Sequence, residues 1–504
     1  MSAYLLGLDN GGTVIKAALF DREGRELAVS SRKTPILTPR PGYVERDMEL
    51  VWQMNCACIR EAIEKAGIEP RKIAGVAVCG HGKGLYAWGK DGKPAYNGIA
   101  STDNRAWEYP QRWEESGIFA RYYPTLCQKI LPCQQLSLLA WLKEHARPVY
   151  DNIAWVFSVK DYIRFRLTGE AYSEATDISG SALMDVKNVR FSGDMLEAFG
   201  VGEMLSCIAP LRYSSDLCGR ITAEAAALSG LSEGLPVAGG MFDVDACAIA
   251  MDITRPEQLC TITGTWSINE AIATEPALNS AISMNSLYAI PGYYLLEESS
   301  ATSAGNLEWV LENCINPAER PHEVPLYRYA DDLVASVAPE ECEVYYLPFL
   351  YGSNAHPLAK ASFIGLTSYH TSAHLLRAVY EGVAYSAKLH IDRLLSVREA
   401  PRAIRMAGGA ANSSLWVQLF ADILGYPIEI VRDVKELGAL GSAMAASIAA
   451  GLYPDYPAAA KAMVRISKEP VLPDRTRTAI YAQKYAKYRA VSNALDNVWE
   501  LFEI

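Results

Sequence analysis

The sequence has few of the features that mark membrane, zinc-binding or secreted proteins. It contains no run of 18 apolar residues, about the length that a membrane-spanning helix needs. Its first residues, 1–9, include neither a basic segment nor a cleavage site, so we expect no signal peptide. Its eleven cysteines form no Cys-x-x-Cys pair and its seven histidines are dispersed, which argues against a structural zinc site. We therefore expect free thiols in a reducing cytoplasm.

The chain also lacks an excess of basic residues. It carries 58 acidic and 47 basic side chains, so its formal net charge is −11. Such a surface disfavours nucleic acid and anionic membranes as partners. It does not disfavour a small phosphorylated ligand, because backbone amides can hold phosphate without basic side chains.

The length and the alternating pattern of the chain favour an α/β fold with two large domains. The 504 residues are too many for one hydrophobic core, and 50% of them are hydrophobic. Short apolar runs alternate with amphipathic stretches, as in α/β proteins. The first three strands should form an antiparallel meander, because a turn at 22–25 joins the second to the third. Strands are predicted at 4–9, 14–21, 26–31, 73–79, 259–263, 403–407 and 428–431, and helices at 48–66, 245–251, 372–390, 414–424, 438–450 and 479–502.

Polar residues and glycines follow the first predicted strand and could hold phosphate groups. Asp9, Gly11, Gly12 and Thr13 make up this turn, and Lys16 follows it closely. Glycines let backbone amides approach an anion, a threonine hydroxyl can join them, and an aspartate can hold a hydrated Mg²⁺ that bridges phosphates. The same residue types are also common in plain hairpin turns, so both interpretations stay open. The turn is not a Walker A loop, because no Gly-Lys-Ser/Thr follows.

Two further glycine turns follow later strands. Gly264 and Thr265 follow the strand at 259–263, which repeats the order of strand, glycine and hydroxyl seen near Gly12. A glycine pair between a strand and a helix suits a nucleotide that lies against the backbone. The candidate nucleotide-binding residues of this kind are Gly408, Gly409, Ala410 and Asn412. Each turn alone is weak support, but their recurrence indicates a long-range duplication with two phosphate-binding loops.

Two aspartates lie where the chain passes from its first half to its second. Asp243 and Asp245 follow a Gly-Gly pair, close to a predicted helix start. An aspartate in such a place is often only the N-cap of the helix. The functional alternative is a general base that accepts a hydroxyl proton during phosphoryl transfer. Either aspartate could serve on this reasoning.

Polar residues in two loops could bind a sugar. His81 and Lys83 lie in one loop after an apolar strand, and Asp103 lies in another. Such loops often carry binding residues, although many of their side chains are ordinary surface. Asp47, by contrast, is predicted as the N-cap of the helix at 48–66.

Taken together and in this order, these motifs resemble the FGGY family of carbohydrate kinases over essentially the whole chain. The most specific match is the family's C-terminal signature, in which residues 361–366 and 374–381 agree at every defined position with the required gap of seven residues. The turn at Asp9 matches the N-terminal phosphate loop. The family's Gly-x-x-Asp-x-x-Ala segment, which supplies the catalytic base, matches Gly240, Asp243 and Ala246, and so selects Asp243 over Asp245.

The resemblance implies two actin-like (RNase H-like) domains that flank a catalytic cleft, divided into residues 1–247 and 248–504. Sugar and catalytic base belong to the first domain and ATP to the second, with Mg²⁺ near Asp9 and Asp243. The phosphates of ATP are expected near Gly11, Gly12, Thr13, Lys16, Gly264 and Thr265, and the adenosine near Gly408, Gly409, Ala410 and Asn412. The sugar is expected near His81, Lys83, Asp103 and Asp243.

Within the family, the opening Gly-Leu-Asp-x-Gly-Gly and the segment 43–47 look most similar to L-xylulose kinases. The loop at 81–84 departs from the Gln-Met-His-Gly of D-xylulose kinases and from the Arg-Glu of glycerol kinases. The expected reaction is therefore ATP-dependent phosphorylation of a ketopentose, with L-xylulose to L-xylulose 5-phosphate first. D-Xylulose, ribulose, glycerol and erythritol stay open as alternative substrates.

Two other classes of protein also stay open. An actin-like ATPase would hydrolyse ATP without a sugar, but it would not explain the match at 361–381. A sugar sensor without activity would be expected to lack Asp243, which is present. We expect a cytoplasmic enzyme, and because many relatives are dimers, a homodimer is a further expectation.

Overall fold

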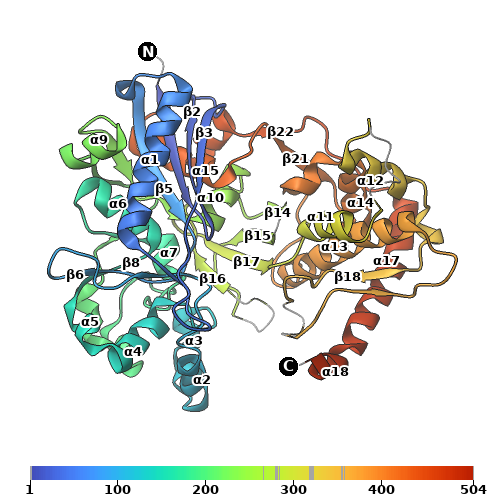
Figure 1. Ribbon diagram of the computed structural model, residues 1–504, viewed down its shortest axis with the longest axis horizontal. Helices are drawn as coiled ribbons and strands as arrows, with labels where there is room; N and C mark the ends of the chain where they lie inside the picture. Colours follow the sequence, from blue (N-terminus) through green and yellow to red (C-terminus); the bar gives the residue numbers. More distant parts are fainter. Residues whose placement is uncertain are drawn as a thin grey trace. The chain divides into compact units, whose positions relative to one another are not determined.

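Two compact units make up the chain, which contains two seven-stranded β-sheets (Figure 1). The computed structural model describes residues 3–264, 266–278, 282, 284–316, 323–353, 356 and 358–502. The first unit comprises Met1–Thr254, Ile272–Leu296 and Asp433–Val464. The second comprises Arg255–Ala271, Glu297–Arg432 and Arg465–Ile504. Both units are discontinuous in sequence.

A seven-stranded sheet forms the centre of the first unit, with the order β11-β12-β5-β1-β2-β3 and with β13 beside β5. The first three strands pair antiparallel, which confirms the predicted meander, and β5 runs parallel to β1. The strands are β1 (Tyr4–Asn10), β2 (Val14–Phe20), β3 (Glu26–Lys33), β5 (Ile73–Gly80), β11 (Leu217–Arg220), β12 (Pro236–Ala238) and β13 (Met241–Phe242).

Helices cover both faces of this sheet. The side chains of Leu6 and Leu8 share one hydrophobic cluster with α1 (Met48–Ala66) and α6 (Val159–Thr168). Gly7 lies between these two leucines, and a side chain at this position would point to the opposite face, because side chains alternate along a strand. There, a Cβ on Gly7 would clash with the carbonyl oxygen of Ala439 in α15 (Leu437–Ala449), so α15 lies almost against the backbone of β1 (Figure 1).

A second hydrophobic cluster of the first unit includes buried residues of α2 (Glu108–Glu115), α3 (Ile118–Leu126), α4 (Gln135–His145), α5 (Arg147–Asn152), α7 (Ala175–Ser179) and α8 (Gly193–Ala198). The N-cap of α1 is Asp47, as predicted, because its side chain accepts a hydrogen bond from Leu50 N. The remaining helices are α9 (Ala223–Ser229), α10 (Asp243–Ala250) and α16 (Tyr456–Met463). The short strands are β4 (Glu45–Arg46), β6 (Tyr86–Gly89), β7 (Gly98–Ile99), β8 (Ile153–Phe157), β9 (Ser173–Glu174) and β10 (Leu211–Arg212).

A second seven-stranded sheet repeats the connectivity of the first, with the order β16-β17-β15-β14-β20-β21-β22. Like β1, β14 pairs antiparallel with the strand that follows it and parallel with a later strand, β20. This repetition confirms the predicted α/β class and agrees with the predicted duplication. The strands are β14 (Leu259–Thr263), β15 (Ser267–Ala273), β16 (Met284–Leu287), β17 (Tyr294–Ser300), β20 (Ile404–Ala407), β21 (Ile428–Arg432) and β22 (Arg465–Ile466); β18 (Tyr345–Leu347) and β19 (Ser362–Ile364) pair separately.

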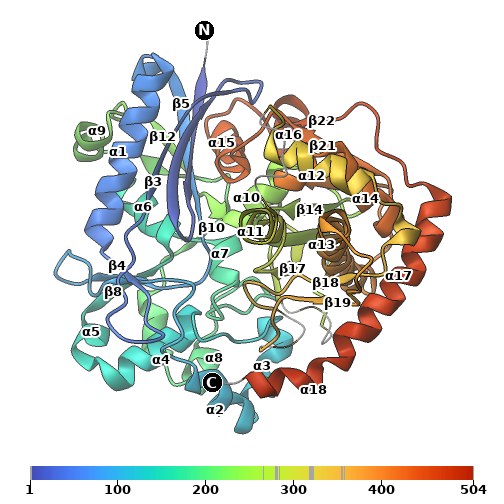
Figure 2. The ribbon, with the colours of Figure 1, turned by 45° about the vertical axis from the view of Figure 1, so that its right-hand side comes forward.

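Aromatic side chains pack between α13 (Ser372–Leu395) and α17 (Arg475–Ala494) of the second unit, two helices that Figure 2 labels. Tyr385 contacts Tyr481, Tyr485 and Tyr488, with ring centroids 6.5, 5.9 and 5.2 Å away. The predicted terminal helix at 479–502 is wrong in its bounds, because the helix begins earlier and is interrupted at Leu495. The other helices of this unit are α11 (Gly305–Asn313), α12 (Leu326–Ala335), α14 (Ser414–Leu424) and α18 (Asp496–Trp499).

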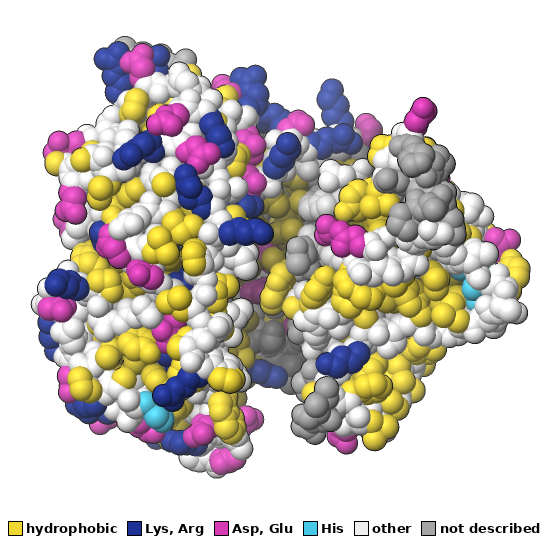
Figure 3. Space-filling view, in the orientation of Figure 1, with side chains coloured by type: hydrophobic (Ala, Val, Ile, Leu, Met, Phe, Trp, Pro, Cys, Tyr) yellow, Lys and Arg dark blue, Asp and Glu magenta, His cyan; other side chains and the backbone are white. Residues whose placement is uncertain are grey.

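Acidic and basic side chains intermingle on the face of the first unit seen in Figure 3. This mixture agrees with a net charge that is only moderately negative for the length of the chain.

Within the part of the chain that the structure describes, no helix combines the length and the apolar character that crossing a membrane requires.

Candidate active site

Asp9 lies at the end of β1 against the N-terminus of α15. The strand alternation that points Gly7 toward α15 also points Asp9 that way. A Cβ on Gly438 would lie only 2.9 Å from Asp9 Oδ2 and 3.2 Å from Cys79 Sγ, so the missing side chain lets the helix approach the carboxylate. A helix N-terminus carries partial positive charge and favours an anion beside it.

An ion pair flanks this carboxylate. Lys16 Nζ lies 2.6 Å from Glu436 Oε2, and Glu436 is the N-cap residue of α15. Burial raises the pKa of Asp9 to about 6; the Lys16 charge opposes this shift and the Glu436 charge adds to it. Burial disfavours the Lys16 ammonium, yet Glu436 and Asp9 outweigh that effect and raise the pKa of Lys16. A raised pKa means that the folded protein destabilises the ionised form of Asp9. Carboxylates with such shifted pKa values are often found at functional sites.

A buried arginine, Arg46, forms hydrogen bonds with the glycine turn that follows β1. The guanidinium of Arg46, which is 1% exposed, donates to the carbonyl oxygens of Gly11, at 3.3 Å, and of Gly12. Gly12 and Thr13 are exposed, and a Cβ on Gly12 would meet nothing within 4 Å. The turn therefore leaves room for a ligand beside its backbone. Arg46 was not among the residues that the sequence singled out, although it lies in the segment 43–47 just before α1.

Asp243 is the first residue of α10 and not its N-cap. The N-cap residue is Phe242, and no side chain caps this helix, so the N-cap interpretation of Asp243 is wrong. The helix also starts two residues earlier than predicted. Burial raises the pKa of Cys79 well above its usual range, and the charges of Asp9 and Asp243 raise it further. Both carboxylates thus approach one buried thiol from different elements.

Asp245 has a structural environment. It is 0% exposed, and its Oδ1 accepts a hydrogen bond from the backbone N of Ala289 at 3.1 Å. Asp243, two residues earlier in the chain, is partly exposed. Of the two aspartates that sequence reasoning left open, only Asp243 is therefore accessible to a ligand within the first unit.

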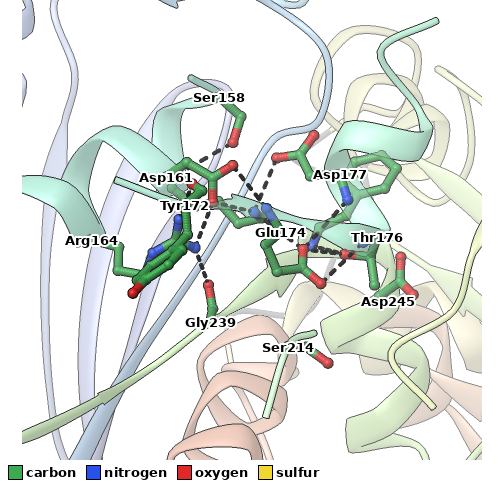
Figure 4. A network of polar contacts seen from close by, with 12 residues as sticks. Ser158, Asp161, Arg164, Tyr172, Glu174, Thr176, Asp177, Ser214, Gly239 and Asp245 are labelled. Atoms are coloured by element: carbon green, nitrogen blue, oxygen red, sulfur yellow. Dashed lines mark hydrogen bonds and ion pairs between the residues drawn. The ribbon is translucent and has the colours of Figure 1, made fainter. Parts of the chain in front are cut away.

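A buried ionic network lies beside the chain that leads to Asp243 (Figure 4). Lys160 Nζ lies 2.7 Å from Asp161, 3.2 Å from Glu174 and 3.7 Å from Asp177. Arg164 Nη1 also bonds Asp161, at 2.7 Å. All of these side chains are at most 3% exposed.

His81 and Lys83 lie near the base candidate in the first unit. Burial, helped by the nearby charge of Arg46, lowers the pKa of His81 to about 3, so the ring is neutral at physiological pH. Its Nε2 lies 3.2 Å from the Tyr86 hydroxyl. Lys83 has a φ of 65° and holds its ammonium 5.4 Å from the ring centroid of Phe242, the neighbour of Asp243.

Asp103 is engaged in a buried salt bridge. Its Oδ1 accepts from Arg105 N and Nε, both at 2.9 Å, and its Oδ2 accepts from Arg105 Nη2 at 2.9 Å and from Val44 N at 2.6 Å. Arg105 also bonds Glu45 at 2.7 Å and stacks on Tyr43, 4.2 Å from its ring centroid. The carboxylate therefore anchors the loop, and its contact with a sugar stays a prediction.

The glycine turns of the second unit emerge from neighbouring parallel strands. Ile262 pairs with Ala407, so the turns at Gly264 and Gly408 leave the sheet at the same edge. Gly408 has a φ of 95°, and a Cβ there would lie 2.6 Å from Thr263 O, so both conformation and space require glycine. Gly408, Gly409 and Asn412 are exposed, whereas Ala410 is buried; Thr265 lies outside the described residues.

The first unit offers a donor set that fits Mg²⁺. Among the described residues, no group of three or more His, Cys, Asp or Glu is arranged to hold a metal by itself. Mg²⁺ does not need such a cage, because it usually takes one or two carboxylates and fills its other positions with water and substrate phosphates. Asp9, whose side chain is partly exposed, fits this requirement.

Two family descriptions match almost all of the chain. Residues 4–250 match the N-terminal domain of the FGGY family of carbohydrate kinases, and residues 259–450 match its C-terminal domain. The chain belongs to the FGGY family. It is a carbohydrate kinase, and the family resemblance noted from its motifs is confirmed.

Individual FGGY proteins resemble the chain over its whole length. The L-xylulose/3-keto-L-gulonate kinase of Escherichia coli (strain K12) is 36% identical over 496 residues, which cover 98% of each chain. A probable L-xylulose kinase of Haemophilus influenzae is 34% identical and covers 98% of this chain and 99% of its own. The crystal structure of xylulose kinase from Rhodospirillum rubrum matches with a TM-score of 0.88 and 26% identity, covering 99% of this chain and 100% of that one.

We predict that Asp103→Asn destabilises the protein by about 3–5 kcal/mol, because it leaves the buried Arg105 guanidinium without its main partner. Urea unfolding measures this change. Asp151→Asn, in an exposed pair with Arg147, is the control and should change stability little. If Asp103→Asn keeps its stability while the KM for sugar rises, Asp103 is a substrate contact and not an anchor.

Asp9→Asn should stabilise the protein at pH 8. The folded-state pKa of about 6 lies above the unfolded value of about 3.9, so the folded state holds its proton longer as the pH rises. Stability is therefore lost between about pH 4 and pH 6, and the neutral asparagine avoids this loss. We expect a gain of about 1–3 kcal/mol at pH 8 that shrinks toward pH 4. Unfolding curves across this range would contradict the account if the variant were less stable at pH 8.

Proposed function

We propose that the chain phosphorylates L-xylulose with ATP and forms L-xylulose 5-phosphate. The observation that carries this proposal is the 36% identity, over 98% of each chain, to an L-xylulose/3-keto-L-gulonate kinase. The second named substrate, 3-keto-L-gulonate, is the alternative that the same relative suggests. D-Xylulose is a further alternative, because a xylulose kinase is 26% identical and has a similar structure.

Asp243 is the proposed general base. It lies at the start of α10, is partly exposed, and its position follows the family's Gly-x-x-Asp-x-x-Ala segment. Its carboxylate takes the proton of the sugar hydroxyl as that oxygen forms a bond to the γ-phosphorus. The bond from this phosphorus to the bridging oxygen breaks, and ADP leaves. A base of this kind helps because a neutral hydroxyl is a weak nucleophile.

The turn after β1 is the proposed phosphate loop of the first unit. Gly11, Gly12 and Thr13 offer backbone and hydroxyl groups beside open space, and Lys16 adds a positive charge. Arg46 supports this role, because it binds the carbonyl oxygens of the turn from the buried side. Mg²⁺, when bound, would be held by Asp9 and by Asp243, and it would neutralise phosphate charge.

The second unit is proposed to bind the rest of ATP. Gly264 and Thr265 are its phosphate residues, and Gly408, Gly409, Ala410 and Asn412 are its adenosine residues. The exposed backbone of Gly408 and Gly409 supports this assignment, because no side chain there hinders a ligand. The proposed boundary between domains, at 247 and 248, lies near the gap between the two matched family domains.

The sugar is proposed to contact Lys83 and Asp243, with His81 and Asp103 shaping the same pocket. A neutral imidazole such as that of His81 has one donor and one acceptor nitrogen, which suits the hydroxyl groups of a polyol. Lys83 holds a strained backbone beside Phe242, which is a feature often found at binding sites. A homodimer and a cytoplasmic location remain further predictions.

The substrate is tested by measuring ADP release with Mg-ATP and a panel of acceptors. The panel holds L-xylulose, 3-keto-L-gulonate, D-xylulose, L- and D-ribulose, glycerol and erythritol. We expect the highest kcat/KM with L-xylulose. A higher value with another acceptor would replace it, and ADP release that depends on no sugar would support an ATPase. Sugar binding without ADP release would support a sensor.

Replacing each aspartate in turn separates the base from the structural carboxylate. Asp243→Asn should lower kcat by about 10²–10⁴-fold, because the amide cannot accept the hydroxyl proton. Asp245→Ala should lower thermal stability, because the backbone N–H of Ala289 loses its acceptor, while the folded protein keeps kcat within about threefold. Steady-state kinetics and thermal unfolding measure both. The assignment is wrong if Asp243→Asn keeps more than about 1% of the activity.

A further inference from the structure

The turn that delivers Asp243 is fixed at both of its ends by buried polar groups (Figure 4). At its start, the carbonyl oxygen of Gly239 accepts a hydrogen bond from Arg164 Nη1 at 2.6 Å. At its end, the backbone N of Phe242 donates to Thr176 Oγ1 at 2.8 Å. Because Asp243 follows Phe242 directly, the second bond sets where the first turn of α10 begins.

Close packing leaves the turn no other path. A Cβ on Gly239 would clash with Tyr213 O, and a Cβ on Gly240 would clash with Val78 O. Gly240 also has a φ of 78°, which favours glycine. Packing therefore fixes the path of the chain as far as Gly240, and beyond it the hydrogen bond from Phe242 N to Thr176 Oγ1 fixes the residue just before Asp243.

The hydroxyl of Thr176 has a defined orientation. It donates to Glu174 Oε2 at 2.8 Å, and a carboxylate can only accept. Its lone pair is then left for the amide of Phe242, which can only donate. The backbone N of Thr176 also donates to Glu174 Oε1, at 3.0 Å, so the carboxylate accepts from both the amide and the hydroxyl of this threonine.

The carboxylate that orients this hydroxyl is itself held by charge. Glu174 lies 3.2 Å from Lys160, and both side chains are 0% exposed. Such a pair keeps a fixed geometry because neither partner has water as an alternative. Lys160, Glu174, Thr176 and the amide of Phe242 thus form one continuous chain of polar contacts within the first unit.

We propose that Thr176 is a positioning residue for phosphoryl transfer, which holds the carboxylate of Asp243 in place through the backbone of Phe242. This inference rests on the proposed role of Asp243 as general base. Thr176 itself touches no reacting atom in this account. Its effect should be large because a reacting group displaced by about 1 Å can lose on the order of 10²-fold in rate.

The test compares two substitutions of Thr176 with a matched control in the full-length protein. Thr176→Val keeps the shape and removes the acceptor, so kcat should fall about 10–100-fold while KM for ATP and L-xylulose stays within about threefold. Thr176→Ser restores the hydroxyl and should return kcat to within about threefold. Thr168→Val is the control, because its buried hydroxyl also accepts a backbone N–H, from Glu170 at 3.1 Å.

The control separates positioning from stability. Thr168→Val should lower the melting temperature about as much as Thr176→Val but leave kcat within about twofold. If both valine variants lose kcat equally, or if Thr176→Val keeps full activity, the proposal is wrong. Should Thr176→Val not fold, Thr176→Ser and Thr176→Ala, compared at equal folded fraction, give the same ranking of kcat.

A second pair of variants shows whether the effect passes through Asp243. In a background of Asp243→Asn, Thr176→Val should lower the residual kcat by less than about threefold, because no base remains to be misplaced. Fully multiplicative losses would contradict the proposal. If Asp243→Asn alone retained activity, the proposed base would fail, whereas a normal Thr176→Val beside an inactive Asp243→Asn would refute only the positioning role.

Discussion

The buried ammonium of Lys160 must keep its carboxylate partners, and the arrangement of the first unit depends on this requirement. Burial disfavours the charge of Lys160, but Asp161, Glu174 and Asp177 outweigh it and raise its pKa to about 12. Burial also raises the pKa of Asp177 to about 7, so the cluster does not carry three full negative charges near neutral pH. Breaking such a group by removing one partner is strongly destabilising. The elements that supply it, α6, β9 and α7, must therefore keep their mutual positions.

The second constraint is the close approach of backbones through glycine. Gly7 lets α15 lie on β1, Gly438 brings the start of that helix to Asp9, and Gly441 lets α15 pass Ala246 of α10. None of these helix glycines is needed for an unusual backbone angle, since only the space requires them. Together they place Asp9 and Asp243 beside the same thiol, Cys79. The functional carboxylates are thus positioned by packing that tolerates no larger side chain.

Much of this fold was predictable because its information is local. Strand alternation, turn residues and glycine caps predicted the meander and α1 with its Asp47 cap, and the family signature at 361–381 predicted the kinase. The bounds of α10 were less predictable, since Phe242 is an unusual N-cap and the helix starts where the chain is held by Thr176. The break at Leu495 likewise carried no glycine or proline signal.

The missing parts of the candidate site depend on contacts between distant residues. Lys16 and Glu436 are 420 positions apart, so no periodicity relates them. Arg46 was not predictable because its partners, the carbonyls of Gly11 and Gly12, are backbone groups without a sequence signature. Gly438 and Gly441 gave one hint in the sequence that the helix containing them packs closely against other elements, because glycine inside a predicted helix usually has a packing reason.

The central claim is that Asp243 acts mainly in the chemical step and contributes only a small part of the binding energy of the sugar. Calorimetric titration of L-xylulose into the Asp243→Asn protein, in the presence of Mg-ATP, tests this claim most directly. The account predicts a Kd within about tenfold of the value for the wild-type protein with Mg-ADP, because one hydrogen bond contributes about 1 kcal/mol. No ADP should form during the titration. A loss of binding beyond about 100-fold, or a normal rate of ADP formation, would contradict it.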